Sequence, residues 1–433
     1  MLITISNLFP RPDQPTRGLY NFYLFKEIAR IQDSGFRIQN ICLVPEWRVW
    51  KWRAIRRWNF PFTADCRLPT SYLPVFYLPF LGRSLNWWFY YRALRGKYAD
   101  HDKIHAPVWG GCPHPPSAVR GRQADGDIRP TRDIRPTDTP TFYVPWLYPD
   151  GVAVALAIRG TGARLWLMAL GSDTFHLKAP CRRRKIVAAC EQAEGIVCVA
   201  QVLADRLAAI GVPLAKLHVV PNGVDTSLFR VRSEEELLSV GASGTPLTTE
   251  QLNNSKLILF VGNLVPVKGP DVMLRAFAAL RENEVQVAAE RHRLLIIGSG
   301  PMKVSLEGLA KELGIADRVK FLGRRSREEV ALWMSKADVL CLSSRSEGMP
   351  NVVLEARASG LPVVTTPSGA IPELPLDKEH FLVVKSSDPA DLAEGLREML
   401  SRDLSVRKSD PIIPTWAMQA ESILKLMRRP DER

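Results

Sequence analysis

The stretch of residues 343–356 reads Ser-Ser-Arg-Ser-Glu-Gly-Met-Pro-Asn-Val-Val-Leu-Glu-Ala. It follows a short apolar run, Val339–Leu342, that is typical of a buried parallel strand. Proline is favoured in the first turn of a helix, so Pro350 predicts that a helix begins there. The stretch is therefore predicted to lead from a strand, through a loop, into a helix N-terminus.

A helix N-terminus in this position suits an anion, because its backbone N–H groups are free and its dipole is positive. Two carboxylates flank it, Glu347 in the loop and Glu355 within the helix. A carboxylate beside a phosphate serves mainly as an acceptor for hydroxyl groups, which sugars and ribose carry. The pattern predicts a sugar nucleotide as ligand. A solvated helix edge is the alternative explanation for two glutamates at this spacing.

The chain beyond residue 255 alternates short apolar runs with amphipathic segments. The apolar runs are Leu257–Val261, Leu294–Ile297, Val319–Leu322, Val339–Leu342, Val363–Thr365 and Phe381–Val384, and the helices are expected to begin near Asp271, Met302, Arg327, Pro350 and Pro389. This alternation predicts an α/β domain with a doubly wound parallel sheet. Ligands of such sheets bind at the carboxyl ends of the strands.

The first half of the chain shows the same alternation less clearly. We predict strands at Leu2–Ser6, Phe36–Val44, Leu165–Ala169 and Gly195–Ala200, helices at Tyr20–Ile31 and Gln201–Ile210, and a loop at Val144–Gly151 that leads into a helix through Ile158. The predicted domains are 1–230, a linker at 231–255, 256–410, and a C-terminal helix within 411–433. Residues 111–140 are rich in Pro, Gly, Arg and Asp and repeat Asp-Ile-Arg-Pro-Thr, which predicts a disordered insertion.

Charge and cysteine content limit the functional classes. The chain of 433 residues has a formal net charge of +13, which favours an anionic partner: a nucleotide, a nucleic acid or an acidic membrane. Seven cysteines without a Cys-x-x-Cys pair favour a reducing compartment and argue against structural zinc, so we interpret Cys112 and His114 as incidental.

No apolar run reaches the roughly 18 residues that span a bilayer, and Met1–Ile5 begins a strand without a basic leader. We expect a cytoplasmic protein, attached peripherally to the inner face of the membrane.

Residues 46–60 and 87–92 interleave aromatic and basic side chains. Such segments favour contact with an anionic membrane interface. Two alternatives remain open: the aromatic residues form core and the arginines a solvated rim, or the segment stacks on single-stranded nucleic acid. The nucleic-acid interpretation rests on charge alone, and we do not expect that partner.

The pattern Glu-x7-Glu followed by Ala358–Val364, together with Pro-Asn-Gly-Val-Asp at 221–225, resembles the signature of retaining glycosyltransferases of family four. Members similar to this chain build bacterial exopolysaccharides and teichuronic acids. The resemblance implies the GT-B architecture, in which two Rossmann-like domains face each other across a cleft and the last helix crosses back to the first domain. It also implies a nucleotide-diphosphate sugar as co-substrate, with no cofactor and no metal.

The resemblance further implies roles for individual residues. Glu347 would bind the donor sugar, Glu355 the ribose, and Lys268 would neutralise the leaving diphosphate. Asp173 is a further catalytic candidate, although a helix N-cap explains it equally. The other candidates for donor binding are Gly18, Asn263, Gly298, Gly300, Arg324, Gly348, Met349, Pro350, Asn351 and Val352. For Gly18 a plain turn, and for Lys268 and Arg324 simple solvation, are the alternatives.

Two positions depart from the family pattern. Leu170 stands where members often carry a histidine that contacts the donor sugar, and His176 is too far downstream to replace it. Asn263 stands where members usually have arginine. The leading hypothesis is a transferase that builds cell-surface polysaccharide on a lipid-linked acceptor. The alternative, motivated by these two departures, is a sugar-nucleotide-binding regulatory or scaffold protein that has lost activity.

Overall fold

The computed structural model describes most of the chain and divides it into two compact units. The first unit consists of residues 1–21, 32–167 and 180–195, and the second of residues 22–31, 168–179 and 196–433. The described residues are 2–6, 19–31, 38–46, 70–76, 88, 90–92, 94–95, 139–171, 177–233, 235–236, 255–280, 292–374, 377–402, 404, 407 and 412–428.

A six-stranded sheet in the order β10-β9-β8-β11-β12-β13 forms the centre of the second unit, and all five of its strand pairs are parallel. Its strands are β8 (Lys256–Val261), β9 (His292–Ile297), β10 (Val319–Gly323), β11 (Val339–Leu342), β12 (Val363–Thr365) and β13 (Phe381–Val383). The intervening helices are η7 (Pro266–Lys268), α10 (Pro270–Ala279), α12 (Lys303–Glu312), α13 (Arg327–Lys336), α14 (Asn351–Ala358), η8 (Ile371–Glu373) and α15 (Pro389–Ser401).

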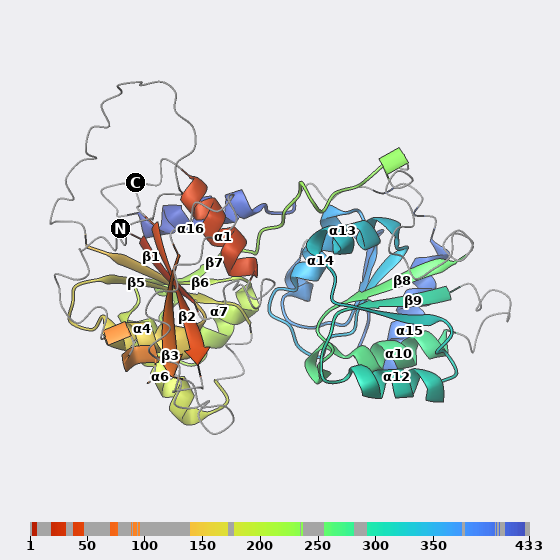
Figure 1. Ribbon diagram of the computed structural model, residues 1–433, viewed down its shortest axis with the longest axis horizontal. Helices are drawn as coiled ribbons and strands as arrows, with labels where there is room; N and C mark the ends of the chain where they lie inside the picture. The colour runs from red at the N-terminus through yellow and green to blue at the C-terminus, as the bar shows by residue number, and fades with distance from the viewer. Residues whose placement is uncertain are drawn as a thin grey trace, which may run out of the picture. The chain divides into compact units, whose positions relative to one another are not determined.

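Alternate residues of β8 point to opposite faces of this sheet. Leu257 and Leu259 join a core cluster with residues of α13 and α14, whereas Ile258 and Phe260 join a second cluster with residues of α10, α12 and α15. Figure 1 shows these two groups of helices on the two sides of the strands. Because both faces are covered, the strands carry continuous apolar runs such as Leu257–Val261 and Val339–Leu342, as is typical of buried parallel strands.

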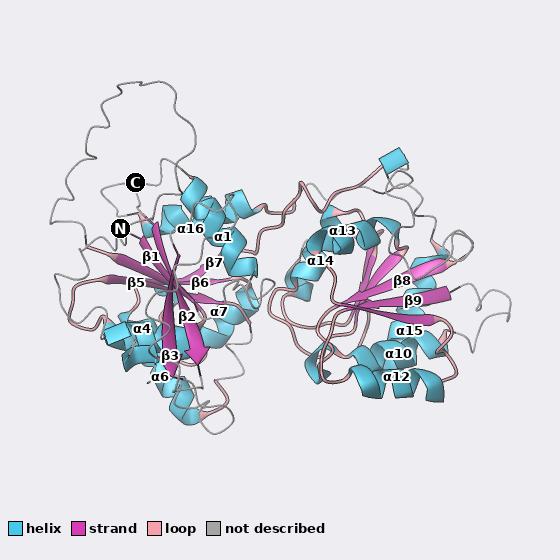
Figure 2. Cartoon of the chain, in the orientation of Figure 1, coloured by secondary structure: helices cyan, strands magenta, loops and turns pink. Residues whose placement is uncertain are grey.

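The second sheet has seven strands in the order β3-β2-β1-β4-β5-β6-β7 (Figure 2). The strands are β1 (Leu2–Ser6), β2 (Ile38–Glu46), β3 (Thr70–Phe76), β4 (Thr141–Pro145), β5 (Arg164–Ala169), β6 (Gly195–Cys198) and β7 (Leu217–Val219). The helices of this part are α1 (Leu19–Arg30), η5 (Leu147–Gly151), α4 (Val152–Ala157), α6 (Pro180–Gln192), α7 (Gln201–Ala208) and η6 (Leu214–Lys216).

The predicted strands and helices beyond residue 255 are confirmed to within two residues. One boundary was wrong in a way that matters for the site: Pro350 is the N-cap of α14, and the helix begins at Asn351. The proline has extended backbone angles there, which fix the direction of the entering chain. The helix N-terminus at which an anion is predicted to bind therefore begins at Asn351.

In the first half of the chain the sequence analysis missed β3, β4, β7 and α6. The predicted loop at 144–151 was partly wrong, because residues 141–145 form β4 and are fully buried. The strand predicted at Leu165–Ala169 is consequently the fifth of its sheet. Short strands without flanking turn residues carry too little periodicity to be distinguished from loops.

Residues 221–225, the Pro-Asn-Gly-Val-Asp segment, lie against the start of α16 (Trp416–Met427), the helix predicted near the C-terminus. The Gly223 N–H donates to the side chain of Gln419 (3.0 Å), and Val224 forms a β-bridge with Thr415. A Cβ on Gly223 would lie 2.5 Å from the backbone nitrogen of Trp416. Glycine is therefore required here by the close approach of the two backbone segments.

The two aromatic and basic segments are described only in part. Residues 47–60 and 111–138 lie outside the described residues, so the membrane and disorder predictions stay untested there. In 87–92, Tyr90 is buried, whereas Trp88 is 39% exposed with the guanidinium of Arg92 over its ring at 5.0 Å. This segment supplies both core and surface residues. Among the described helices, none is long and apolar enough to cross a bilayer.

Candidate functional site

The loop between β11 and α14 is tied to the loop after β8 by hydrogen bonds. The Ser343 hydroxyl donates to the carbonyl of Gly269 (2.8 Å), and the Arg345 N–H donates to the carbonyl of Val267 (2.9 Å). From the other side, the Thr366 hydroxyl donates to the carbonyl of Ser344 (2.6 Å). These bonds bring together two loops that both follow the carboxyl ends of neighbouring parallel strands, where ligands of such sheets bind.

Lys268 and Glu347 meet at the junction of these two loops. The Lys268 ammonium donates to both carboxylate oxygens of Glu347, at 2.6 and 2.7 Å. The Ser344 hydroxyl also donates to Glu347, at 2.6 Å. The Glu347 side chain is 7% exposed and the Lys268 side chain 27% exposed, so the carboxylate is oriented by its donors and the ammonium keeps access to solvent. The ammonium is thus available to an incoming anion.

The side chain of Arg345, in the loop before α14, also binds the segment that follows β8. Its guanidinium donates to both oxygens of Asp271 (3.0 and 2.7 Å) and to the carbonyl of Pro266 (2.6 Å). The hydrogen bond and charge of Arg345 hold the pKa of Asp271 below its ordinary value. Asp271 lies in the first turn of α10 and Pro266 begins η7, which ends at Lys268. The pair therefore fixes the segment that carries Lys268.

Gly348 lies in direct backbone contact with residues 170 and 171. A Cβ on Gly348 would be 2.5 Å from the carbonyl oxygen of Leu170 and 2.8 Å from the Cα of Gly171. Gly171 itself has φ +113°, in the region that favours glycine. Leu170, which departs from the family pattern, is thus placed next to the Glu347 loop by its backbone.

The N-terminus of α14 has no side-chain cap from the described residues. Its first residue, Asn351, accepts a hydrogen bond through Oδ1 from the amide of Asn222 (2.7 Å). Met349 and Val352 pack against the core with their apolar side chains, so their backbone amides, rather than their side chains, are the groups that suit an anion. The predicted binding of an anion by residues 348–352 stays a prediction.

Glu355 lies on α14 with a mostly buried side chain, 20% exposed. Burial, and to a smaller extent the charge of Asp225, raises its pKa from 4.5 to about 7, while Arg327 acts in the opposite direction. The Arg327 Nη2 lies 3.8 Å from Glu355 Oε1, an ion pair without a hydrogen bond. When this carboxylate is ionised, it can accept hydrogen bonds from hydroxyl groups.

Gly298 and Gly300, predicted to lie close to the nucleotide, have a packing reason to be glycine. A Cβ on Gly298 would overlap the carbonyl of Gly262, and one on Gly300 would overlap the carbonyl of Leu264. The intervening Ser299 accepts a hydrogen bond from Arg324 Nε (2.8 Å). Asn263 is exposed at the end of β8. These residues line the carboxyl ends of β8, β9 and β10.

Two of the predicted residues, Gly18 and Asp173, lie outside the described residues, as does His176. Two ion pairs near the site were not predicted from the sequence. They are the pair of Arg327 with Asp225 and the pair of Arg345 with Asp271. Arg327 lies within a Ser-x-x-Glu capping box formed by Ser326 and Glu329, a local pattern that indicates the start of a helix but not the ion pairs of Arg327.

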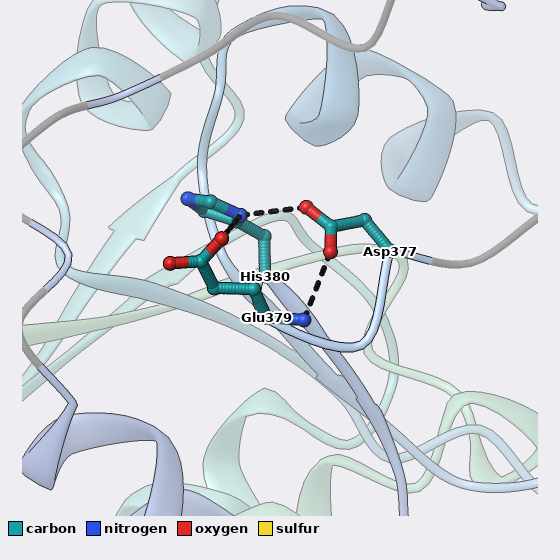
Figure 3. A group of neighbouring side chains, drawn as sticks. All are labelled: Asp377, Glu379 and His380. Carbon is teal, nitrogen blue, oxygen red and sulfur yellow. Dashed lines mark hydrogen bonds and ion pairs between the residues drawn. The ribbon is translucent and has the colours of Figure 1, made fainter.

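Asp377, Glu379 and His380 form a group whose ligand atoms lie within 4.8 Å of one another (Figure 3). The His380 Nδ1 lies 2.8 Å from Asp377, and the Glu379 N–H donates to the same aspartate (3.0 Å). The two carboxylates are 59% and 65% exposed, so water competes strongly for them. The mutual hydrogen bonds account for the group without an ion.

Two family models match the chain. Residues 249–410 match the model described as "Glycosyl transferases group 1", and residues 146–228 match that of "Glycosyltransferase Family 4". The first match contains Lys268, Glu347 and Glu355, and the second contains Leu170 and Asp225. Both matches are to models of glycosyltransferase domains.

Among similar proteins, a D-inositol 3-phosphate glycosyltransferase of Mycolicibacterium vanbaalenii is 35% identical over 194 residues, 44% of this chain and 41% of that protein. The matched part of the chain thus spans about two fifths of that relative. A GDP-mannose-dependent alpha-(1-6)-phosphatidylinositol monomannoside mannosyltransferase of Mycobacterium tuberculosis is 27% identical over 335 residues, 72% of this chain and 84% of that protein.

The fold resembles that of solved structures. Anabaena HepE, in complex with UDP and glucose, superposes with a TM-score of 0.62 at 15% identity and covers 98% of this chain and 94% of its own. This likeness, with the two parallel sheets, confirms the predicted two-Rossmann GT-B fold class.

Proposed function

We propose that this chain, which carries glycosyltransferase domains of the group 1 and family 4 types, transfers a sugar from a nucleotide-diphosphate donor to a glycan acceptor. The observation that carries the proposal is the contact between Lys268 and Glu347 at the junction of two strand-end loops, just before the uncapped N-terminus of α14. An ammonium and free backbone amides suit a diphosphate, and oriented carboxylates suit the hydroxyls of attached sugars.

In this mechanism the leaving diphosphate binds between the Lys268 ammonium and the amides of residues 349–352. Negative charge grows on the leaving phosphate as the bond to the sugar breaks, and these donors stabilise it most at that point. Glu347, oriented by hydrogen bonds from Lys268 and Ser344, accepts hydrogen bonds from hydroxyl groups of the donor sugar. Glu355 accepts hydrogen bonds from the hydroxyl groups of the ribose.

We propose that the reaction retains the configuration of the anomeric carbon and needs no metal ion. Lys268 and the helix dipole supply the positive charge that a metal would otherwise supply to the diphosphate. The leaving phosphate itself takes the acceptor proton on the same face of the sugar. No covalent carboxylate intermediate is needed in this scheme.

We propose a lipid-linked acceptor and a role in cell-surface polysaccharide synthesis at the inner face of the membrane. The relative from Mycobacterium tuberculosis is named for a phosphatidylinositol monomannoside acceptor. The net charge of +13 favours contact with an anionic membrane. Residues 46–60 and 87–92 are the candidate contact, of which Trp88 and Arg92 are exposed on the described surface.

The second candidate function is nucleotide-sugar binding without transfer. It is motivated by Leu170, whose carbonyl lies beside Gly348 at the position where the family often has a donor-contacting histidine. A protein that binds the donor through Lys268 and Glu355 but lacks this contact would serve as a regulator or scaffold.

A two-step experiment tests these functions. Thermal shift against a panel of UDP- and GDP-sugars identifies the donor, because a ligand that binds only the folded state raises its stability. Donor hydrolysis and transfer to lipid-extract acceptors are then measured for the wild type and for Glu347→Gln. Turnover that falls at least roughly a hundredfold in Glu347→Gln supports the transferase. Binding without turnover on any acceptor supports the second function, and no binding of any sugar nucleotide contradicts both.

A further inference from the structure

Arg327 is shared by two carboxylates that come from distant parts of the second unit. Its Nη1 lies 3.8 Å from Asp225 Oδ2, and its Nη2 lies 3.8 Å from Glu355 Oε1. Both distances permit strong electrostatic attraction but exceed hydrogen-bonding range. The guanidinium therefore acts on both carboxylates mainly through its charge.

Aromatic rings, rather than hydrogen bonds to these carboxylates, hold the guanidinium in place. It lies over the ring of Tyr23 at 4.3 Å and over the ring of Phe229 at 5.2 Å. Its Nη1 is buried and has no hydrogen-bond partner among the described residues. Stacking of this kind keeps a planar cation in one orientation while leaving its N–H groups unused.

The carboxylate of Asp225 is also held by hydrogen bonds from the two residues Ser227 and Leu228. Its Oδ1 accepts hydrogen bonds from the Ser227 hydroxyl (2.6 Å) and from the backbone N–H groups of Ser227 and Leu228 (both 3.2 Å). These donors hold the Asp225 carboxylate in one orientation, with its second oxygen toward Arg327. One guanidinium thus faces two carboxylates, Asp225 and the mostly buried Glu355, so the cluster has a net charge of −1 when both are ionised.

We propose that Arg327 is a positioning residue that favours the ionised form of Glu355 and thereby sets the pH dependence of nucleotide binding, with Asp225 acting in the opposite sense. The inference rests on the proposed function, because it takes the ribose hydroxyls of the donor as the ligand of Glu355. Ionised Glu355 has acceptors for both hydroxyls, whereas the protonated form gives up part of that capacity.

The charges around Glu355 determine the expected direction of each effect. Burial raises its pKa most, Asp225 raises it further, and Arg327 lowers it. Among the described residues, Arg327 on α13 and Asp225 in the segment after β7 are the charged groups that act on Glu355, and the ring of Tyr23 on α1 stacks with Arg327. Removing the charge of Arg327 should therefore move the titration of Glu355 to higher pH, and removing that of Asp225 should move it to lower pH.

The test measures the Kd of UDP and of GDP by calorimetry between pH 5.5 and 8.5. In the wild type the affinity is expected to fall as the pH drops below about 7, the value to which the pKa of Glu355 is raised. For Arg327→Met the midpoint moves up and the Kd at pH 7 rises by roughly threefold to tenfold; for Asp225→Asn the midpoint moves down. Glu355→Gln binds more weakly and loses this pH dependence.

Two further variants separate an electrostatic role from a merely structural one. Arg327→Lys keeps the charge and should retain most of the wild-type profile. Arg275→Met removes an exposed arginine on α10 and should leave the profile unchanged. A role in packing alone would weaken binding equally at every pH. The proposal is overturned if Arg327→Met and Asp225→Asn shift the midpoint in the same direction, or if neither shifts it.

A stability measurement keeps the inference testable when no nucleoside diphosphate binds, an outcome that contradicts the proposed function. The urea midpoint of each protein is followed against pH, with Glu355→Gln subtracted to isolate the titration of Glu355. Opposite shifts of this titration in Arg327→Met and Asp225→Asn support the electrostatic coupling by itself. Coincident curves overturn it.

Discussion

The ammonium of Lys268 lies 2.6 Å from Oε1 and 2.7 Å from Oε2 of Glu347, although the two residues are 79 positions apart in the chain. The carboxylate is nearly buried, so the ammonium is its main source of compensating charge. The two residues form an ion pair, and the loss of either one leaves the charge of the other uncompensated.

Replacing Lys268 by Met is expected to lower kcat for sugar transfer or donor hydrolysis by about 10²- to 10³-fold, because a donor to the leaving diphosphate is lost. Stopped enzyme assays with the donor found by thermal shift measure this change. Lys303→Met is the matched control, since Lys303 forms an exposed ion pair with Glu307 on α12. Equal activity of the two variants would contradict the role of Lys268.

Replacing Gly348 by Ala is expected to destabilise the protein by about 1–3 kcal/mol, because the new Cβ would press against the carbonyl of Leu170. Urea denaturation measures the change. Gly308 offers a control within α12, where an added Cβ meets nothing within 4 Å. Gly308→Ala should stabilise the protein by about 0.5–1 kcal/mol. Similar effects at both glycines would show that the backbone contact at Gly348 is not tight.

Replacing Glu355 by Gln is expected to stabilise the protein at high pH and to change little at low pH. Burial raises the folded-state pKa to about 7, above the ordinary value of 4.5, so the folded protein binds more protons between these values. The wild type therefore loses stability as pH rises from 4.5 through 7. The variant should gain roughly 2–3 kcal/mol relative to wild type at pH 8.

Urea midpoints of both proteins at pH 5 and pH 8 test this expectation. The difference between the two proteins should widen with pH, and Arg397→Met, remote from this cluster, should show no such widening. A constant difference at both pH values would mean that Glu355 titrates normally in the folded protein.

Replacing Arg345 by Gln is expected to reduce stability at pH 7 by about 0.5–1 kcal/mol, since the ion pair with Asp271 is partly exposed. Arg345 holds the pKa of Asp271 below its ordinary value of 3.8. The stabilisation is thus present above that value and lost as pH falls through the lower folded-state pKa. Denaturation at pH 7 and pH 3, with Asp271→Asn to complete a double-mutant cycle, measures the coupling. Coupling that persists undiminished at pH 3 would rule out this ionic origin.

The six-stranded sheet and the positions of the loops that follow its strands could be predicted from the residues alone. Its strands are short apolar runs between helices of regular period, and both patterns are local, so boundaries such as Val339–Leu342 follow directly from the residues. The family signature then located Glu347 and Glu355. In the first half, β3 and β4 were missed because short strands flanked by irregular sequence have no distinctive period.

Only the tertiary structure decided which of these residues touch. Lys268 meets Glu347 because parallel pairing of β8 with β11 brings their following loops together. Arg327 lies between Asp225 and Glu355, which are 130 residues apart, through the packing of α13 beside α14. Such contacts depend on closing long loops of chain, and no local pattern encodes them, so the charge balance at Glu355 could be read only from the folded protein.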